Sequence, residues 1–288
     1  MNKKAKVSEH SGNAENVRDT SRVETPKRPQ PTFVNAGVDA LLMQFGQELD
    51  PCMPGFLASI RAAIIAELSD VVYEVVPSYA SLLVYYEPRA VRTYDLEQAL
   101  ETIAEQTPWL CSPWSADAEA PGKLVEVPIY YYQPDDAIEE NDMARVCEQS
   151  GLSFDEVVAI HSGRDYQVYA LGFAPGFAYL GALDERIQLP RLANPRKNIA
   201  AGSVGIAEGQ TAVYPQESPG GWNILGFSPF VWFDVNGHAN GNVDKNTPAQ
   251  QAALTPVQVG DRIRFKPMSK SAYEQAKAKF FAQQGDST

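Results

Sequence analysis

The hydrophobic positions early in the chain follow first a strand pattern and then a helix pattern. Residues 40–45 (ALLMQF) form a short apolar run that ends at a glycine. Beyond it, apolar residues recur at spacings of three and four, at Leu57, Ile60, Ile64 and Leu68. This period places all four on one face of a helix, so the segment predicts an amphipathic helix.

A second pair of strands and a second helix follow. Residues 71–76 and 82–86 are β-branched and aromatic runs, separated by Pro77 and Ser78, and they predict two strands joined by a turn. Residues 96–103 repeat the helical stripe, and the helix would begin at Thr93 or Asp95 as its N-cap. The order strand, helix, strand, strand, helix predicts a small α+β sandwich with a split βαβ unit.

Later in the chain the pattern changes to many short strands. We expect strands over residues 124–132, 167–173, 203–207, 211–214, 230–235 and 262–265, and short helices over residues 137–149 and 153–161. Ser153 and Glu156 stand at the spacing of a capping box. Short strands between glycine and proline turns predict a mainly β domain, either a barrel or a sandwich. The polar stretch 271–284 predicts a terminal helix on the surface.

Two segments lack a sustained hydrophobic period and mark boundaries. Residues 1–32 contain no aromatic residue, leucine or isoleucine, so they cannot offset the entropy cost of ordering, and we expect a disordered tail rather than a basic docking arm. Residues 107–123 carry three prolines and predict a linker. The expected division is a tail (1–32), an α+β domain with its linker (33–120), a β domain (121–270) and a C-terminal helix or tail (271–288).

Composition and charge narrow the class of protein. The 288 residues are 44% hydrophobic and 21% charged, as in ordinary globular proteins, and the net charge of −12 argues against a nucleic-acid partner. No apolar stretch predicts a signal peptide or a membrane span. The three cysteines are widely spaced and no zinc-ligand pattern occurs, so the sequence predicts neither a disulfide framework nor a metal site. We expect a cytoplasmic protein without a nucleic-acid or membrane partner.

An unusual loop follows the strand expected at residues 167–173. The stretch YALGFAPGFAYLG alternates aromatic residues with glycine and proline. Gly172 and Gly176 permit backbone conformations closed to other residues, and Pro175 fixes its own φ. The result would be a stiff, shaped loop in which Phe173 and Phe177 either contact a ligand or simply pack in the corner of a barrel.

Residues 190–226 concentrate hydroxyls, basic groups and glycines in a short stretch. Such a stretch can hold a carboxylate or a phosphate on side chains and free backbone N–H groups, although a series of hairpin turns is the alternative interpretation. No P-loop motif for ATP is present. His161 stands where a helix would meet the strand that enters the shaped loop, and it is either an acid/base group or a structural histidine.

Several strings occur together in a characteristic order: GFAPGFAYLG, AGSVGIAEGQT, SPGGW and GDRIRF. They resemble the family that contains the 5-oxoprolinase B subunit, a Kip-type inhibitor of a sporulation histidine kinase, and subunit 1 of allophanate hydrolase, equivalent to half of a urea carboxylase carboxyltransferase domain. The resemblance covers about residues 36–268. It implies an N-terminal ferredoxin-like α+β domain followed by a cyclophilin-like β-barrel.

The resemblance also implies a function. It is that of the B subunit in a multi-subunit, ATP-dependent 5-oxoprolinase, which opens 5-oxo-L-proline to L-glutamate. Its partners would be a homologous, C-like barrel subunit that shares a cleft with this chain, and an A-like subunit. ATP would be used by the complex, at a site that the resemblance leaves open, with no metal from this chain, which we expect to be inactive alone. A subunit of allophanate hydrolase or of a carboxyltransferase, or a Kip-type kinase inhibitor, shares the same motifs and stays an alternative.

Site residues are expected within these motifs. The expected catalytic residues are His161, Gln210 and Tyr214. The expected substrate contacts are Phe173, Pro175, Gly176, Phe177, Arg196, Ser203, Gly205, Thr211, Ser218, Gly220, Gly221 and Trp222. The sequence departs from the family pattern at Glu208, where a glycine is expected, and at Phe227, where an arginine is expected. Both departures would make an anion site less positive.

Overall fold

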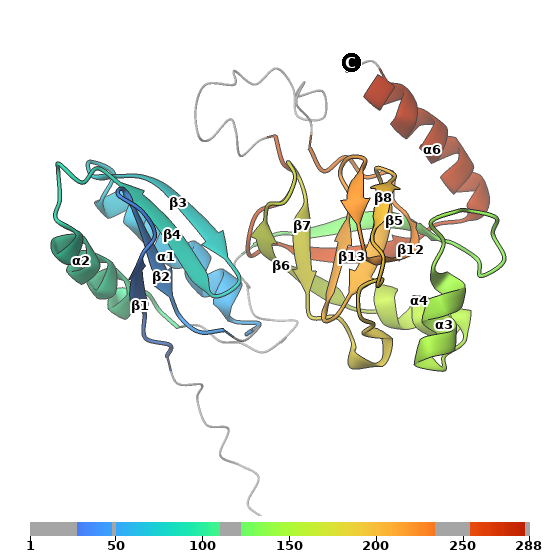
Figure 1. Ribbon diagram of the computed structural model, residues 1–288, viewed down its shortest axis with the longest axis horizontal. Helices are drawn as coiled ribbons and strands as arrows, with labels where there is room; N and C mark the ends of the chain where they lie inside the picture. Colours follow the sequence, from blue (N-terminus) through green and yellow to red (C-terminus); the bar gives the residue numbers. More distant parts are fainter. Residues whose placement is uncertain (1–27, 48–49, 110–121, 234–253, 286–288) are drawn as a thin grey trace, which may run out of the picture.

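The chain folds into two units, each with its own hydrophobic core (Figure 1). The computed structural model describes residues 28–47, 50–109, 122–233 and 254–285. The first unit contains one core cluster, and the second contains a barrel interior and a further aromatic cluster outside it. This arrangement places the shaped loop and the glycine-rich stretch in the second unit.

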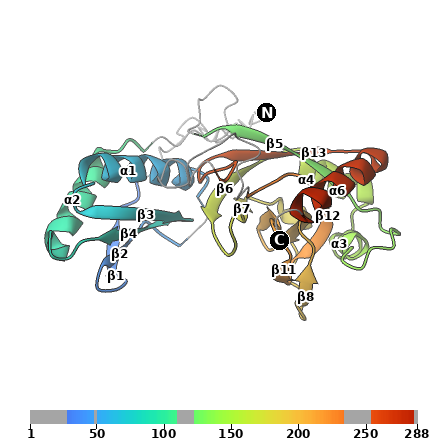
Figure 2. The same cartoon turned by 90° about the horizontal axis from the view of Figure 1, so that it is seen from above.

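The first unit is a four-stranded antiparallel sheet with α1 along one face (Figure 2). Its elements are β1 (Thr32–Asn35), β2 (Ala40–Gln44), α1 (Met53–Glu67), β3 (Val72–Ser78), β4 (Ser81–Tyr86) and α2 (Thr93–Gln106). The strand order is β1-β2-β4-β3, so β4 lies between the two strands that α1 connects and the split βαβ unit is confirmed. Leu57, Ile60 and Ile64 are fully buried, as their spacing predicts. A ferredoxin-like fold stays a prediction.

The ends of the first unit differ from the expectation. Arg28 donates hydrogen bonds to the backbone carbonyls of Glu105 and Thr107, and β1 begins at Thr32, so the predicted tail extends too far. Residues 1–27 of that tail lie outside the described residues. At the other boundary, Trp109 packs edge-on against a core phenylalanine of α1, so residues 107–109 belong to this unit rather than to a linker. Residues 110–121 lie outside the described part.

The second unit is a closed barrel with the strand order β10-β7-β6-β13-β5-β12-β9 among the described residues. Its strands are β5 (Leu124–Tyr131), β6 (Asp165–Leu171), β7 (Ala178–Gly181), β9 (Ser203–Ala207), β10 (Gln210–Val213), β12 (Asn223–Phe227) and β13 (Arg262–Pro267). Strands β5 and β13 run parallel, and the other pairs are antiparallel. The expected barrel is therefore present, whereas its cyclophilin-like character stays a prediction.

The remaining elements surround the barrel. A separate ribbon pairs β8 (Arg196–Ile199) with β11 (Ser218–Gly220), and the helices are α3 (Met143–Ser150), α4 (Phe154–Ser162), the short 3-10 helix η1 (Glu185–Ile187) and α6 (Lys270–Gly285). The capping box of α4 is confirmed, since Ser153 and Glu156 bond to each other's backbone N–H. The sequence did not predict β7, β8, β11 and β12, because glycine and proline interrupt the alternation of apolar and polar residues in these stretches.

Three sequence expectations about local structure are wrong. The helix expected from residue 137 begins only at Met143, because residues 134–142 form turns closed by side chains such as Asn141. No strand occupies residues 230–233, the described part of the strand expected at 230–235. Helix α2 is preceded by Arg92 without a side-chain cap, because the Thr93 hydroxyl bonds to the Tyr86 hydroxyl at 2.7 Å instead.

The cysteines also depart from the expectation. Cys52 is disulfide-bonded, whereas Cys147 is a free thiol. The expectation that the sequence encodes no disulfide is therefore wrong at Cys52, because spacing along the chain says little about which cysteines meet in space.

The departure at Phe227 serves the packing of α6. Phe227 is buried, and its ring lies 5.5 Å from that of Tyr273 and 5.4 Å from that of Phe280, centroid to centroid. Both partners come from α6, so an aromatic residue at this position anchors the terminal helix on the barrel. An arginine here would place a charge where the structure buries three aromatic rings.

Candidate functional site

The shaped loop joins β6 to β7 and lies at one end of the barrel. The Gly172 N–H donates to the carbonyl of Phe177 at 3.1 Å, which closes the loop. Gly176 has φ +81°, and a Cβ there would lie 2.6 Å from the backbone oxygen of Trp232. Phe173 also has a left-handed backbone, with φ +73°, and its side chain is 63% exposed. The loop therefore holds an exposed aromatic ring in a strained conformation, which is typical of functional sites.

An aromatic cluster extends from this loop into the barrel unit. The buried ring of Phe177 makes edge-on contacts with four others, with centroid separations of 5.2 Å to Phe173, 4.9 Å to Tyr179, 5.7 Å to Tyr214 and 5.9 Å to Trp222. These rings come from the loop, from β7, from the end of β10 and from the segment between β11 and β12. Edge-on packing fixes their orientation relative to one another.

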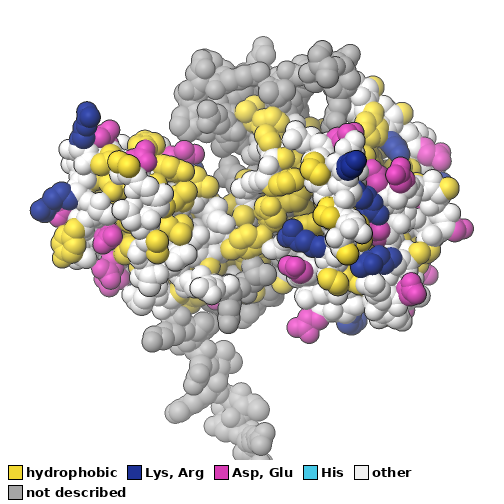
Figure 3. Space-filling model, in the orientation of Figure 1, with side chains coloured by type: hydrophobic (Ala, Val, Ile, Leu, Met, Phe, Trp, Pro, Cys, Tyr) yellow, Lys and Arg dark blue, Asp and Glu magenta, His cyan; other side chains and the backbone are white. Residues whose placement is uncertain are grey.

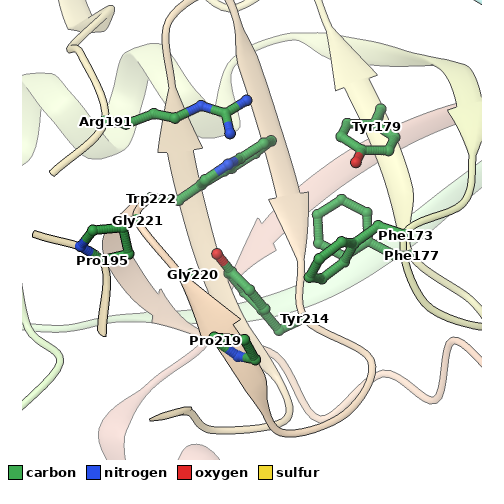
Figure 4. Close-up of a pocket in the computed structure, with 10 residues that line it drawn as sticks. All are labelled: Phe173, Phe177, Tyr179, Arg191, Pro195, Tyr214, Pro219, Gly220, Gly221 and Trp222. Atoms are coloured by element: carbon green, nitrogen blue, oxygen red, sulfur yellow. The ribbon is translucent and has the colours of Figure 1, made fainter. Parts of the chain in front are cut away.

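A pocket of about 260 Å³ opens beside this cluster (Figure 4). Its lining residues are Phe173, Phe177, Tyr179, Arg191, Pro195, Tyr214, Pro219, Gly220, Gly221 and Trp222. A pocket for a drug-sized ligand usually has about 300–1,000 Å³, so this one suits a smaller molecule. On the face shown in Figure 3, hydrophobic side chains gather where the two units meet, and Lys and Arg side chains lie beside them on the barrel.

Glycine is required at Gly220 for the pocket to exist in this form. A Cβ on Gly220 would lie 2.2 Å from the Tyr214 hydroxyl oxygen and 2.8 Å from Cδ1 of Ile199. Burial raises the pKa of Tyr214 to about 12, so its phenol is protonated at neutral pH and can donate a hydrogen bond. The glycine thus makes room for a protonated phenol at the pocket wall.

The positive charge of the pocket comes from Arg191. Its guanidinium carbon lies 6.0 Å from the centre of the Trp222 ring, and the side chain extends over the indole toward Tyr179 (Figure 4). The neighbouring backbone is fixed because the Leu192 N–H donates to the carbonyl of Gly221 at 2.7 Å. None of the described residues that line the pocket is acidic.

Arg196, the arginine that the sequence favours as an anion ligand, has a partner inside the protein. Its two terminal nitrogens donate to both carboxylate oxygens of Asp142, at 2.9 and 2.8 Å. The same carboxylate accepts the Ile224 N–H at 2.7 Å. Arg196 is absent from the pocket lining, and its charge is neutralised where it lies. It joins the β8–β11 ribbon to α3 rather than binding a ligand in the pocket.

Gln210 connects the two units. Its amide nitrogen donates to the Tyr79 hydroxyl at 2.8 Å, and Tyr79 lies in the turn between β3 and β4 with φ +24°. The Tyr79 ring stacks on Tyr169 and contacts Tyr179, with centroid separations of 6.1 and 5.9 Å. Because Tyr179 lines the pocket, the first unit supports one pocket wall through Tyr79.

His161 lies in the barrel interior, away from the pocket lining. It is fully buried, and its ring stacks on Phe265 at 4.7 Å. The Tyr131 hydroxyl lies 2.6 Å from Nδ1, and Thr211 Oγ1 lies 3.0 Å from Nε2. Thr211 donates its own proton to the carbonyl of Gly205, so Nε2 must donate to Thr211 and Nδ1 must accept from Tyr131. Burial lowers the pKa of His161 to about 3, so the ring is neutral at physiological pH.

The expected site residues therefore separate into two groups. The pocket brings together Phe173, Phe177, Tyr214, Gly220, Gly221 and Trp222. The residues outside its lining are Pro175, Gly176, Ser218, Arg196, Ser203, Gly205, Thr211, Gln210 and His161. Sequence reasoning missed Tyr79, Tyr179 and Arg191 as parts of the site. No spacing signal distinguishes Arg191 from its neighbours, and Tyr79 lies far from the motifs along the chain.

The backbone conformation at Glu208 explains why the family pattern has a glycine at this position. It lies in the turn between β9 and β10 with φ +53°, in the left-handed region that glycine adopts without cost. Its N–H donates to the carbonyl of Leu189 at 2.7 Å, and the residue does not line the pocket. Glutamate in place of glycine therefore affects the β9–β10 turn and not the lining of the pocket.

The described residues contain no group of three or more His, Cys, Asp or Glu side chains that could hold a metal ion. No helix among them has the length and apolar character needed to cross a membrane.

Comparisons with known proteins agree with this architecture. Residues 31–241 match the family model described as "Carboxyltransferase domain, subdomain C and D". The chain is similar to the 5-oxoprolinase B subunit of Bacillus subtilis (strain 168), with 32% identity over 243 residues, 82% of this chain and 92% of that protein. It is 37% identical to the 5-oxoprolinase B subunit of Escherichia coli O157:H7 over 171 residues, 59% of this chain and 68% of that protein.

Two solved structures have a related fold. The crystal structure of TTHA0988 matches with a TM-score of 0.62 and 28% identity over 80% of this chain, which spans only 40% of that protein. The urea carboxylase of Kluyveromyces lactis matches with a TM-score of 0.65 over 86% of this chain and 22% of that protein, at 16% identity, which supports the fold alone. From the family model and the Bacillus relative together, the chain belongs to the family of the 5-oxoprolinase B subunit and carries a carboxyltransferase-type C and D domain.

Proposed function

We propose that this chain is the B subunit of a multi-subunit, ATP-dependent 5-oxoprolinase and that the barrel pocket contributes to its substrate site. The observation that carries the proposal is the similarity to the 5-oxoprolinase B subunit over 92% of the Bacillus protein. The small pocket supports it, because aromatic walls and one guanidinium without a carboxylate partner among the described residues suit a compact ring that bears an acid.

The reaction adds water across the ring amide of 5-oxo-L-proline. The water oxygen bonds to the carbonyl carbon, the C–N bond breaks, and the nitrogen takes a proton to give L-glutamate. A lactam is stabilised by resonance, so its carbonyl must be activated. Transfer of the terminal phosphoryl group of ATP to the amide oxygen makes that carbon a better electrophile. Water then bonds to the carbon and the C–N bond breaks, which leaves an acyl phosphate, and a second water releases phosphate from it to give L-glutamate.

This chain supplies binding and orientation rather than a nucleophile. The protonated Tyr214 phenol can donate to an oxygen of the bound ring, and the rings of Phe177 and Trp222 exclude water from its faces. The sequence has no P-loop motif, so the proposal gives ATP binding to the complex and not to a particular chain. The buried, neutral His161 has no access to the pocket and is assigned to packing.

The test is reconstitution. ADP and glutamate formation from 5-oxoproline is measured for this chain alone, with its homologous barrel partner, with the A-like subunit, and with both. We expect turnover only in the complete mixture. Within that mixture, Tyr214→Phe should lower kcat/KM by about ten- to a thousand-fold, the scale of losing one oriented donor. Tyr273→Phe, at a tyrosine of α6 that lies outside the pocket lining, is the matched control.

Two results would contradict the proposal. One is ATP-dependent turnover by the purified chain alone. The other is a complete mixture that assembles but leaves 5-oxoproline intact, in which case urea carboxylation, allophanate hydrolysis and histidine kinase inhibition are the next activities to assay.

A further inference from the structure

Arg191 differs from the other described arginines of the barrel unit. Each of the others has a hydrogen-bond or carboxylate partner within the protein: Arg145 with Asn223, Arg164 and Arg186 with Asp184, Arg196 with Asp142, and Arg262 and Arg264 with Asp165. Among the described residues, Arg191 has only the face of Trp222. Its N–H donors therefore stay available for a bound molecule.

The free guanidinium is directed at the pocket. Arg191 and Trp222 both line it, and the side chain extends across the indole toward Tyr179 (Figure 4). Burial is the main influence on the pKa of Tyr214, and the charge of Arg191 acts against it, as it does at Tyr79. The cation thus lies close to two phenols, and the described lining of the pocket contains no acidic side chain that could neutralise it.

The pocket also restricts the shape and charge of its occupant. A guanidinium presents paired N–H donors that match the two oxygens of a carboxylate, while its flat face can stay on an indole. The walls are the rings of Phe177, Tyr179 and Trp222, which favour a flat, compact ligand over a strongly hydrated dianion. A single cation suits a monoanion.

We propose that Arg191 is the anion anchor of the pocket and that it binds the carboxylate of a small ring monoacid whose ring lies between the aromatic walls. The inference rests on the proposed function only for the identity of that acid, 5-oxo-L-proline. Recognition of the carboxylate by Arg191 would hold for another ring monoacid as well. An oxyanion of phosphate shares part of this chemistry, and the experiment distinguishes the two.

The test compares how the unaltered chain and its arginine variants bind a ring acid and the corresponding neutral ring. Calorimetry on the full chain, alone and with its barrel partner, measures the dissociation constants of 5-oxo-L-proline and of 2-pyrrolidinone, which has the same lactam ring without the carboxylate. Benzoate with benzamide forms a second pair of ligands, and inorganic phosphate is titrated separately. The variants are Arg191→Gln and Arg191→Lys, with Arg89→Gln, an exposed arginine of the first unit, as the matched control.

For each ligand pair that binds, we expect Arg191→Gln to raise the dissociation constant of the acid by about ten- to a hundred-fold, the scale of losing a charge-assisted hydrogen bond. The dissociation constant of the neutral ring should stay unchanged. Arg191→Lys should give a dissociation constant for the acid between those of the unaltered chain and of Arg191→Gln, because lysine keeps the positive charge but lacks the paired N–H donors of a guanidinium. Arg89→Gln should bind as the unaltered chain does.

The outcomes separate the two proposals. Loss of benzoate binding on Arg191→Gln without any binding of 5-oxoproline would support the anchor and contradict the proposed substrate. Binding of 5-oxoproline that is indifferent to Arg191 would overturn the anchor and leave the proposed function standing. The anchor is also overturned if acid and neutral ring weaken equally, if phosphate alone depends on Arg191, or if no ring acid binds either preparation.

Discussion

Arg191 and Arg196 lie close together in the chain but have opposite surroundings. Arg196 makes a paired contact with Asp142, which also accepts a backbone N–H. Arg191 lies over the Trp222 ring at 6.0 Å, and no described residue gives it a carboxylate partner. A guanidinium that already holds a carboxylate has little left to offer a ligand, so the pocket's charge depends on which of the two arginines the protein itself has neutralised.

A second residue, the buried His161, leads to a prediction about the stability of the protein in acid. Its pKa is lowered by burial to about 3, compared with about 6.5 in an unfolded chain. The folded state therefore binds fewer protons, so the contribution of a neutral His161 is fully present above about pH 6.5 and is lost as pH falls toward 3. Between about pH 6 and 4 this group should lower the free energy of unfolding by roughly 1.4 kcal/mol per pH unit.

Urea unfolding at about pH 7, 6 and 5 measures this slope. The comparison is His161→Leu, which removes the titrating ring while the other groups still titrate. The variant should be less stable at neutral pH, because it leaves the Tyr131 and Thr211 hydroxyls without their partner. Its stability should fall less steeply with acid. Parallel pH dependences in the two proteins would show that His161 takes up a proton without unfolding.

At the scale of elements, the turn between β3 and β4 joins the two units. Tyr79 in this turn stacks on Tyr169 of β6, contacts Tyr179 of β7 and accepts a hydrogen bond from Gln210 of β10. These three strands are consecutive in the barrel order, so one side chain from the first unit spans them. Through the contact of Tyr79 with Tyr179, the turn supports a residue of the pocket wall.

A double-mutant cycle tests this connection. Tyr79→Phe and Gln210→Ala should each cost about 1 kcal/mol in free energy of unfolding, and the double variant should cost less than the sum, because both remove the same hydrogen bond. Gln98→Ala on the exposed side of α2 serves as the control partner, for which the losses should add. Kinetics in the reconstituted complex address the expected catalytic role of Gln210. If Gln210→Ala lowers kcat/KM further in the Tyr79→Phe background, the amide acts on the substrate.

At the scale of the whole molecule, the described part of the first unit begins with Arg28 and β1. Arg28 binds two carbonyls at the end of α2, where a cation is favourable, and β1 covers the edge of β2. Phe33 of β1 packs against the core of the unit. The residues before Arg28 carry few apolar groups by their sequence.

Two truncations distinguish these parts. Removal of residues 1–27 should leave the melting temperature within about 2 °C of that of the full chain, because the segment offers little apolar surface to bury. Removal of residues 1–36 also deletes β1 and should lower it by several degrees. A clear loss of stability on the shorter truncation would mean that residues before Arg28 pack on the fold.

The sequence by itself determined the elements whose signals are local. The stripe of Leu57, Ile60 and Ile64 predicted α1, and Ser153 with Glu156 predicted the start of α4, because helix faces and caps involve residues three or four positions apart. Strands with alternating or β-branched patterns were found as well. The short strands of the glycine-rich stretch were missed, since their pairing depends on partners elsewhere in the barrel.

Only the tertiary structure decided which polar groups face the pocket. Asp142 neutralises Arg196 from 54 positions away in the chain, and Thr211, 50 positions from His161, accepts the hydrogen bond of its ring Nε2. Tyr79 reaches Gln210 across 131 positions and between two units. Residue type and spacing could identify an arginine, a histidine and a glutamine as candidate site residues. Whether each is free to bind a ligand depends on which distant group the closed barrel brings to its side chain.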